Sequence, residues 1–252
     1  MRNIKVTLEY DGSRYDGWQK QGNTERTIQG RMEAVLERMT GHPTEVSGAG
    51  RTDAGVHAEG QTANFRVPEH FSPEDVKNYL NTYLPEDIRI VEAREAEEKF
   101  HSRLNASAKL YRYRIWTGAK RPVFERKYLY GFGRRLDAEA MRRAAGFLIG
   151  EHDFKSFCAN RRMKKSTVRR IDEIKIVEHG TKIELLYTGN GFLYNMVRIL
   201  TGTLLEIGSG MRKPEEMKVI LEAKNRDMAG RTAPPEGLFL LHVAYEGERK
   251  TV

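Results

Sequence analysis

The chain has 252 residues, which allows one large domain or two small ones, each with its own core. Its 43 lysines and arginines outnumber its 35 acidic residues, and the formal charge of +8 favours a polyanionic partner, nucleic acid or an anionic membrane surface. Cys158 is the only cysteine, which excludes a disulfide framework and a thiolate metal cluster. No apolar run approaches the roughly 18 residues of a membrane span, and the first residues begin a strand-like pattern rather than a signal peptide. We therefore expect a soluble, cytoplasmic protein without a metal.

The first half of the chain alternates strand and helix signals. Residues 4–10 alternate apolar and polar side chains, the pattern of a half-buried strand. Apolar residues then recur at helical spacing from Ile28 to Met39, and Gly41 is a plausible helix end. The further elements predicted in this half are a strand over residues 61–67, a helix that begins at Ser72-Pro73 with an acidic capping residue, and a strand over residues 88–91.

The second half repeats this order of elements. The predicted elements are a strand around Tyr111–Ile115, a helix capped by Asp137 that ends near Gly150, a hairpin around His179-Gly180, a helix from about Phe192 to Ile207, a helix opened by Pro214, and a strand over Leu238–Tyr245. This repetition predicts an α+β protein with two tandem ferredoxin-like (RRM-like) halves, each a mainly antiparallel sheet backed by helices, with an active-site cleft between them. We place the boundary near Asn105, which gives halves of residues 1–104 and 105–252.

A glycine-rich segment, Ser47–Ala58, presents Arg51 and Asp53 among residues with little side-chain bulk. It could be an ordinary surface turn, or a loop that holds a carboxylate against a substrate. The dinucleotide fingerprint fails because Asp53 stands where a third glycine is required, and no P-loop lysine follows. Asp53-Ala54-Gly55 resembles an aspartic-protease triplet, whose site needs a second carboxylate. A dimer could supply one, but the basic composition makes a peptide substrate unattractive.

Arg198 is the single charged residue of the apolar segment 196–205. Arginine keeps its charge, so a buried Arg198 needs an anionic partner, for which Asp53 is a candidate that spacing alone does not prove. Alternatively, its side chain reaches solvent. Tyr111 and Tyr113 share one strand face, where they form part of a core or stack on an unpaired base.

Residues 160–170 contain six basic residues in eleven. Such a run is usually a solvated loop, but the overall charge favours contact with phosphates. The predicted RNA-binding residues in this loop are Arg161, Arg162, Lys164 and Lys165. The cations that would extend the surface, if they converge, are Arg14, Lys20, Arg51, Arg103 and Arg112.

The segment Gly50–Ala58 resembles the catalytic loop of the TruA family of tRNA pseudouridine synthases. The resemblance covers essentially the whole chain, and its loop motif is highly specific. The supporting blocks, in order, are Tyr10-Asp11-Gly12 with Gly17-Trp18-Gln19, Phe100-His101-Ser102-Arg103, Lys109-Leu110-Tyr111-Arg112-Tyr113, Asn195-Met196-Val197-Arg198 and Pro235-Glu236-Gly237-Leu238.

This resemblance implies an isomerase that converts uridine to pseudouridine at positions 38, 39 and 40 of the tRNA anticodon stem-loop. It implies that Asp53 is the catalytic aspartate and that Tyr111 stacks on the target base and relays its proton. It also implies that Arg198 pairs with the aspartate and that Arg51 helps to hold the flipped nucleotide. The family works as a homodimer that binds tRNA across both subunits and uses no cofactor.

The reaction explains why these residue types are suitable. The nucleotide must leave its stem before the glycosidic bond can be reached, at a cost of a few kcal/mol of unstacking. One carboxylate can then attack C1′ or remove the C2′ proton to give a glycal, and the sequence does not choose between these routes. The alternative class is a non-catalytic RNA-binding or chaperone protein, which has no use for Asp53 in a polyanion site. The role of Cys158 stays open, and for His57 we expect a structural hydrogen-bonding role.

Overall fold

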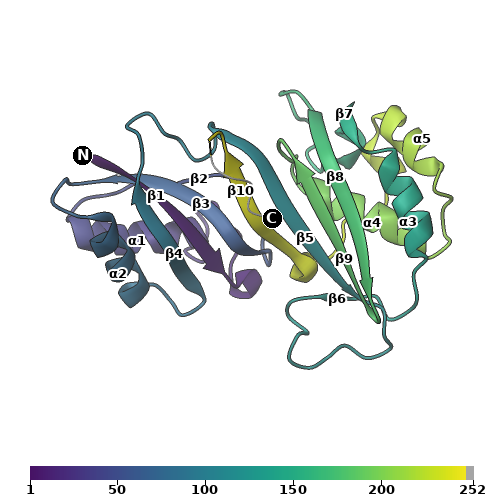
Figure 1. Cartoon of the computed structure of the whole chain (residues 1–252), viewed down its shortest axis with the longest axis horizontal. Helices are drawn as coiled ribbons and strands as arrows, with labels where there is room; N and C mark the ends of the chain where they lie inside the picture. Colours follow the sequence, from purple (N-terminus) through teal and green to yellow (C-terminus); the bar gives the residue numbers. More distant parts are fainter. Residues whose placement is uncertain (248–252) are drawn as a thin grey trace. The chain divides into compact units, whose positions relative to one another are not determined.

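The computed structural model describes residues 1–247 (Figure 1). The chain divides into two compact units. The first unit contains Met1–Ser107 together with the residues from Phe239 onward, and the second contains Ala108–Leu238. Both combine helices with mainly antiparallel sheet, so the predicted α+β class is confirmed. Among the described residues, no helix is long and apolar enough to cross a membrane.

The first unit is a sheet with two helices. Its elements are β1 (Arg2–Tyr10), α1 (Ile28–Thr40), β2 (Ser47–Gly48), β3 (His57–Val67), α2 (Pro73–Tyr83), β4 (Ile88–Glu95) and β10 (Leu238–Tyr245). The strands lie in the order β4-β1-β3-β10, and β2 pairs with β3 at Ala63 and Asn64. The β1 pairings with β3 and β4 are antiparallel, whereas β10 runs parallel to β3.

Local signals fix the helix ends of the first unit. The Thr27 side chain accepts a hydrogen bond from the Gly30 amide at the start of α1, and Gly41 ends this helix with φ of 78°. Ser72 and Asp75 form a complete capping box at the start of α2. Both predicted helices are therefore confirmed at the predicted ends. Strand β3 differs, because it begins at His57 and so includes the end of the glycine-rich segment.

The second unit combines three helices with mainly antiparallel strands. Its elements are β5 (Ala106–Trp116), β6 (Tyr130–Gly131), α3 (Ala138–Gly146), β7 (Gly150–Asp153), β8 (Val168–His179), β9 (Lys182–Gly189), α4 (Met196–Gly208) and α5 (Glu216–Ala223). The order β5-β9-β8-β7 is antiparallel throughout, and β6 runs parallel to β5. The predicted hairpin is confirmed as β8 and β9.

Two helix boundaries in the second unit differ from those predicted. Helix α3 stops at Gly146 because Gly150, with φ of 104°, begins strand β7. Helix α4 begins at Met196 rather than near Phe192, because Asn195 adopts a left-handed conformation with φ of 59° that a helix cannot continue. This turn brings Asn195 next to Arg198, one helical turn further along.

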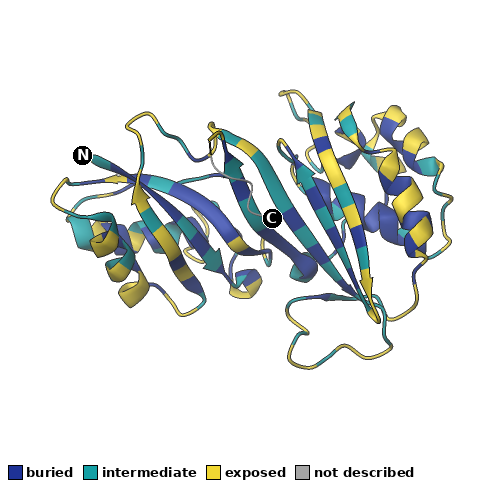
Figure 2. Cartoon of the chain, in the orientation of Figure 1, coloured by how far each residue is buried: buried dark blue, intermediate teal, exposed yellow. Residues whose placement is uncertain are grey.

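Each unit has its own core, seen as the dark blue bands of Figure 2. In the first unit, Ile4, Val6 and Leu8 of β1 are fully buried. In the second unit, Tyr113 and Tyr187 are fully buried on the paired strands β5 and β9. Strand β8 is mostly exposed along its length, in agreement with its yellow bands in the figure. The predicted halves and the observed units differ at β10, which pairs with β3 of the first unit.

Candidate active site

The glycine-rich segment begins in β2, forms a loop over residues 49–56 and continues into β3. The start of this loop is held by β3: the Ala49 amide donates to the Thr62 carbonyl at 2.8 Å, and the Gln61 side chain donates to the Gly50 carbonyl at 2.8 Å. After these anchored residues, Arg51 is exposed and Asp53 is half-buried. The loop is therefore an ordered feature that leaves the Asp53 carboxylate partly accessible.

Thr52 is the fixed point next to Asp53. Its carbonyl accepts a hydrogen bond from the Trp18 amide at 3.0 Å, and its hydroxyl lies 2.8 Å from the Tyr10 hydroxyl. Burial raises the pKa of Tyr10 well above its ordinary value, so this phenol stays protonated. Hydrogen bonds thus hold both the backbone and the side chain of Thr52, and this restrains the backbone position of the next residue, Asp53.

Two glycines allow the neighbouring segments to approach the loop this closely. A Cβ atom at Gly17, whose φ is +100°, would lie 2.7 Å from the Thr52 carbonyl oxygen and 3.2 Å from the Asp53 carbonyl carbon. A Cβ atom at Gly12 would lie 1.9 Å from the Val56 carbonyl oxygen. Neither position accepts a side chain without moving the loop. The motifs around residues 10–12 and 17–19 therefore pack directly on the loop.

His57 holds the far end of the loop. Its ring is buried and stacks on Phe239 at a centroid distance of 4.7 Å, and its Nδ1 accepts a hydrogen bond from the Gly12 amide at 3.1 Å. The Asp11 carboxylate also lies 3.2 Å from Nδ1. While Nδ1 accepts from the Gly12 amide it carries no proton of its own. These contacts agree with the structural role expected for His57.

Tyr111 and Tyr113 lie on the same face of β5, but their side chains have different surroundings. The Tyr113 hydroxyl donates to the Pro234 carbonyl at 2.7 Å within a fully buried site, so this tyrosine belongs to the core. Tyr111 is only 7% exposed, and its ring packs edge-on against the ring of Phe192, with centroids 5.2 Å apart. Tyr113 is therefore a core residue, and Tyr111 is the candidate of the two for stacking on a base.

Arg198 is half-buried on α4, where neighbours in the second unit orient its guanidinium group. Nε donates to the Ala233 carbonyl at 2.8 Å, and Nη1 donates to the Asn195 side chain at 2.9 Å. The Ala233 amide in turn donates to the Arg198 carbonyl at 3.0 Å. The sequence predicted neither of these acceptors, although Asn195 stands only three residues before Arg198. Asp53 belongs to the first unit and Arg198 to the second, so their pairing stays a prediction.

The predicted RNA-binding residues are exposed, with one restraint that the sequence did not reveal. Arg161 makes a bidentate ion pair with Asp227, one contact of which measures 3.1 Å. Arg162, Lys164 and Lys165 form no ion pair with an acidic side chain of residues 1–247. Arg103 is also exposed. The loop thus offers cationic groups to solvent while Asp227 holds its first arginine.

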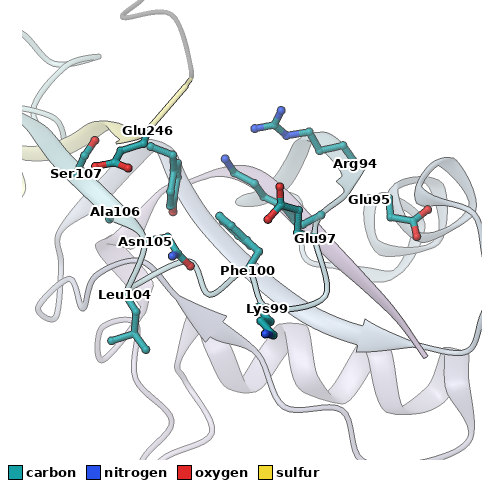
Figure 3. A pocket seen from close by; sticks show the side chains of 13 residues that line it. Arg94, Glu95, Glu97, Lys99, Phe100, Leu104, Asn105, Ala106, Ser107 and Glu246 are labelled. Atoms are coloured by element: carbon teal, nitrogen blue, oxygen red, sulfur yellow. The ribbon is translucent and has the colours of Figure 1, made fainter.

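A cavity of about 580 Å³ lies elsewhere in the first unit (Figure 3). Lys5, Arg94 and Phe100 are among its lining residues, and Asp53 is not. Lys5 Nζ lies 3.7 Å from the centre of the Tyr245 ring, and burial together with the charge of Arg94 lowers the pKa of Lys5 to about 8. This cavity therefore does not contain the predicted catalytic loop. No group of three or more metal-ligating side chains occurs within residues 1–247.

The model of the tRNA pseudouridine synthase family matches residues 7–105 and 144–246. The chain is 45% identical to tRNA pseudouridine synthase A of Bacillus sp. (strain KSM-64) over 245 residues, which cover 97% of this chain and 100% of the relative. It is 44% identical, with the same coverage, to the proteins of that name from Caldicellulosiruptor bescii and Clostridium kluyveri. The chain belongs to the tRNA pseudouridine synthase family. The family predicted from the Gly50–Ala58 motif is therefore confirmed.

Family membership places the chain among isomerases that act on tRNA. The matched segments include Asp53 in the first unit and Arg198 in the second. They leave out residues 106–143, and with them Tyr111. The roles of all three residues stay predictions, and the loop geometry supports that of Asp53 most directly.

The buried contact between Tyr10 and Thr52 predicts a measurable effect on turnover. Replacing Tyr10 with Phe leaves the Thr52 hydroxyl without this partner and should cost about 1 kcal/mol of unfolding free energy. Because the freed loop no longer holds Asp53 as firmly, kcat should fall by about tenfold. Steady-state kinetics and urea unfolding measure the two effects.

Tyr187→Phe is the matched control, because the Tyr187 hydroxyl lies 2.8 Å from the Thr201 hydroxyl in an equally buried site of the second unit. Both variants should lose similar stability, while the loss of kcat should be specific to Tyr10→Phe. Equal kcat values for the two variants would contradict the positioning role of Tyr10.

Proposed function

We propose that the chain isomerises uridine to pseudouridine in tRNA, at positions 38, 39 and 40 of the anticodon stem-loop. The observation that carries this proposal is the half-buried Asp53 in a loop clamped on both sides by the segments around Tyr10 and Trp18. A carboxylate at that point is a liability in a site that only binds a polyanion, because it repels phosphates. It is required in a site that acts on a sugar carbon.

The target nucleotide leaves the helical stem, since its glycosidic bond is out of reach while it is stacked. Asp53 then either attacks C1′ or removes the C2′ proton. In both routes the C1′–N1 bond breaks and the uracil takes the electron pair. The uracil turns and its C5 atom bonds to C1′. This step breaks the C1′–Asp53 ester bond in the first route, and in the second route Asp53 returns the proton to C2′. C5 finally loses its own proton. One carboxylate suffices because the leaving uracil is a stabilised anion, unlike the alcohol of an ordinary glycoside, which needs a second acid.

Three further residues complete this mechanism. Arg198, already oriented by Asn195 and Ala233, pairs with Asp53 and keeps it ionised. Tyr111 stacks on the free base and passes on the C5 proton. Arg51, which is exposed beside Asp53, holds the nucleotide outside the stem. Arg103, Arg161, Arg162, Lys164 and Lys165 contact the phosphates of the tRNA.

We also propose the architecture that this chemistry requires. Each unit is one ferredoxin-like half, and the active-site cleft lies between the two halves. The strand order β4-β1-β3 with β2 on the far side of β3 supports this assignment for the first unit. The working enzyme is a cytoplasmic homodimer that binds tRNA across both subunits and needs no cofactor.

The proposal predicts that Asp53→Asn abolishes product formation. The variant should lose at least ~10³-fold in rate, because the amide can neither attack C1′ nor remove the C2′ proton. Its affinity for tRNA should stay near that of the parent protein. Tritium release from tRNA labelled at C5 of uridine reports turnover, and filter binding reports affinity. Glu45→Gln, which changes an exposed carboxylate in the same unit, should keep full activity. Parental tritium release by Asp53→Asn would rule out this mechanism.

Neutralising the basic loop should weaken tRNA binding without affecting the chemical step. In Lys164→Gln with Lys165→Gln, two phosphate contacts are lost, so the slope of log K against log salt should become shallower by roughly 1 to 2. Lys218→Gln removes an exposed lysine on α5 and serves as the control, with an unchanged slope. An unchanged slope in the double variant would place this loop away from the RNA.

A further inference from the structure

The loop between β5 and β6, residues 117–128, carries the most exposed aromatic side chain of the described chain. Phe124 is 93% exposed and its neighbour Val123 is 65% exposed. Figure 1 shows this segment as a long excursion beyond the end of β5, and Figure 2 shows most of it as exposed. It lies within residues 106–143, outside the segments matched by the family model. Covering this ring with a partner would remove apolar surface from water, which is favourable.

The loop is held in one conformation on both sides of the aromatic ring. Glu125, the next residue, accepts hydrogen bonds from Arg114 of β5 at 2.6 Å and from Lys182 of β9 at 2.7 Å. The Val123 carbonyl accepts from the Arg126 side chain at 2.5 Å. Earlier in the loop, the Trp116 indole donates to the Lys120 carbonyl at 2.6 Å. Phe124 therefore projects from an anchored turn, and little conformational entropy is left to lose when it binds.

Charge indicates the kind of partner that would cover this ring. Residues 117–128 contain four cationic residues and one acidic residue, and all four cations are exposed. One of the four, Arg121, lies 3.7 Å from the Glu236 carboxylate. The acidic residue, Glu125, is already neutralised by Lys182 and Arg114, which lower its pKa. A two-fold contact of this loop with itself in a second copy would bring cations against cations. An aromatic ring between cations instead matches an unpaired nucleotide, whose base stacks while its phosphates are neutralised.

We propose that Phe124 is a stacking platform for an unpaired nucleotide of the tRNA, and that Lys120, Arg121, Arg126 and Lys127 contact the flanking phosphates. The ring binds a base outside the reacting position, so it contributes to affinity and to the register of the tRNA rather than to bond exchange. This inference rests on the proposed function for the identity of the RNA. It adds a contact surface in the second unit that neither the Gly50–Ala58 loop nor the basic loop at residues 160–170 supplies.

Equilibrium binding of an unmodified tRNA transcript tests the proposal with three substitutions at one position. Phe124→Ala should raise Kd about tenfold at physiological salt, because one base loses its stacking partner. Phe124→Leu keeps apolar bulk without a ring and should bind as weakly as Phe124→Ala. Phe124→Trp should restore the parental Kd, since indole stacks at least as well. Met211→Ala, which removes another exposed apolar side chain of the second unit, should leave Kd unchanged.

A parental Kd in Phe124→Ala or in Phe124→Leu would overturn the proposal. So would a smaller particle mass of Phe124→Ala in light scattering with an unchanged Kd, because this result identifies a second copy as the partner. Because Phe124 makes no core contact, the variants should melt at the parental temperature. Pseudouridine formation by the parental protein is scored separately, so an inactive parent would refute the proposed function without deciding whether Phe124 stacks on RNA.

Discussion

The double restraint on Thr52 is the interaction on which the candidate site depends. The glycine and alanine residues around Asp53 leave room for a substrate. Their small side chains also restrain the loop backbone very little. The Trp18 amide and the Tyr10 hydroxyl remove that freedom one residue before Asp53. The same restraint explains Gly17, because a side chain there would collide with the Thr52 carbonyl. Accessibility and rigidity are thus supplied by different segments of the first unit.

In the second unit, hydrogen bonds orient a cation, the guanidinium group of Arg198. A guanidinium group on an apolar helix needs acceptors, and Arg198 finds two of them in the carbonyl of Ala233 and the side chain of Asn195. These acceptors are neutral, so they orient the arginine without cancelling its charge. In the mechanism proposed above, that charge acts on Asp53. Each unit therefore orients one member of the proposed pair.

Much of the fold could be predicted because its signals are local. The alternation in β1, the helix end at Gly41 and the capping box at Ser72 each depend on residues within one turn or one strand. The contacts that build the site could not be predicted in this way. Tyr10 meets Thr52 across 42 residues, and Arg161 meets Asp227 across 66. Asp53 was found only because its glycine-rich surroundings and its motif are themselves local.

The most direct test of the central claim, that Asp53 in its clamped loop performs uridine isomerisation in tRNA, is a map of pseudouridine in an unmodified tRNA transcript after incubation with the purified protein. The account predicts pseudouridine at positions 38, 39 and 40 with the parental protein and none with Asp53→Asn. A transcript that stays unmodified under conditions of tight binding, or that is modified equally by Asp53→Asn, would contradict it.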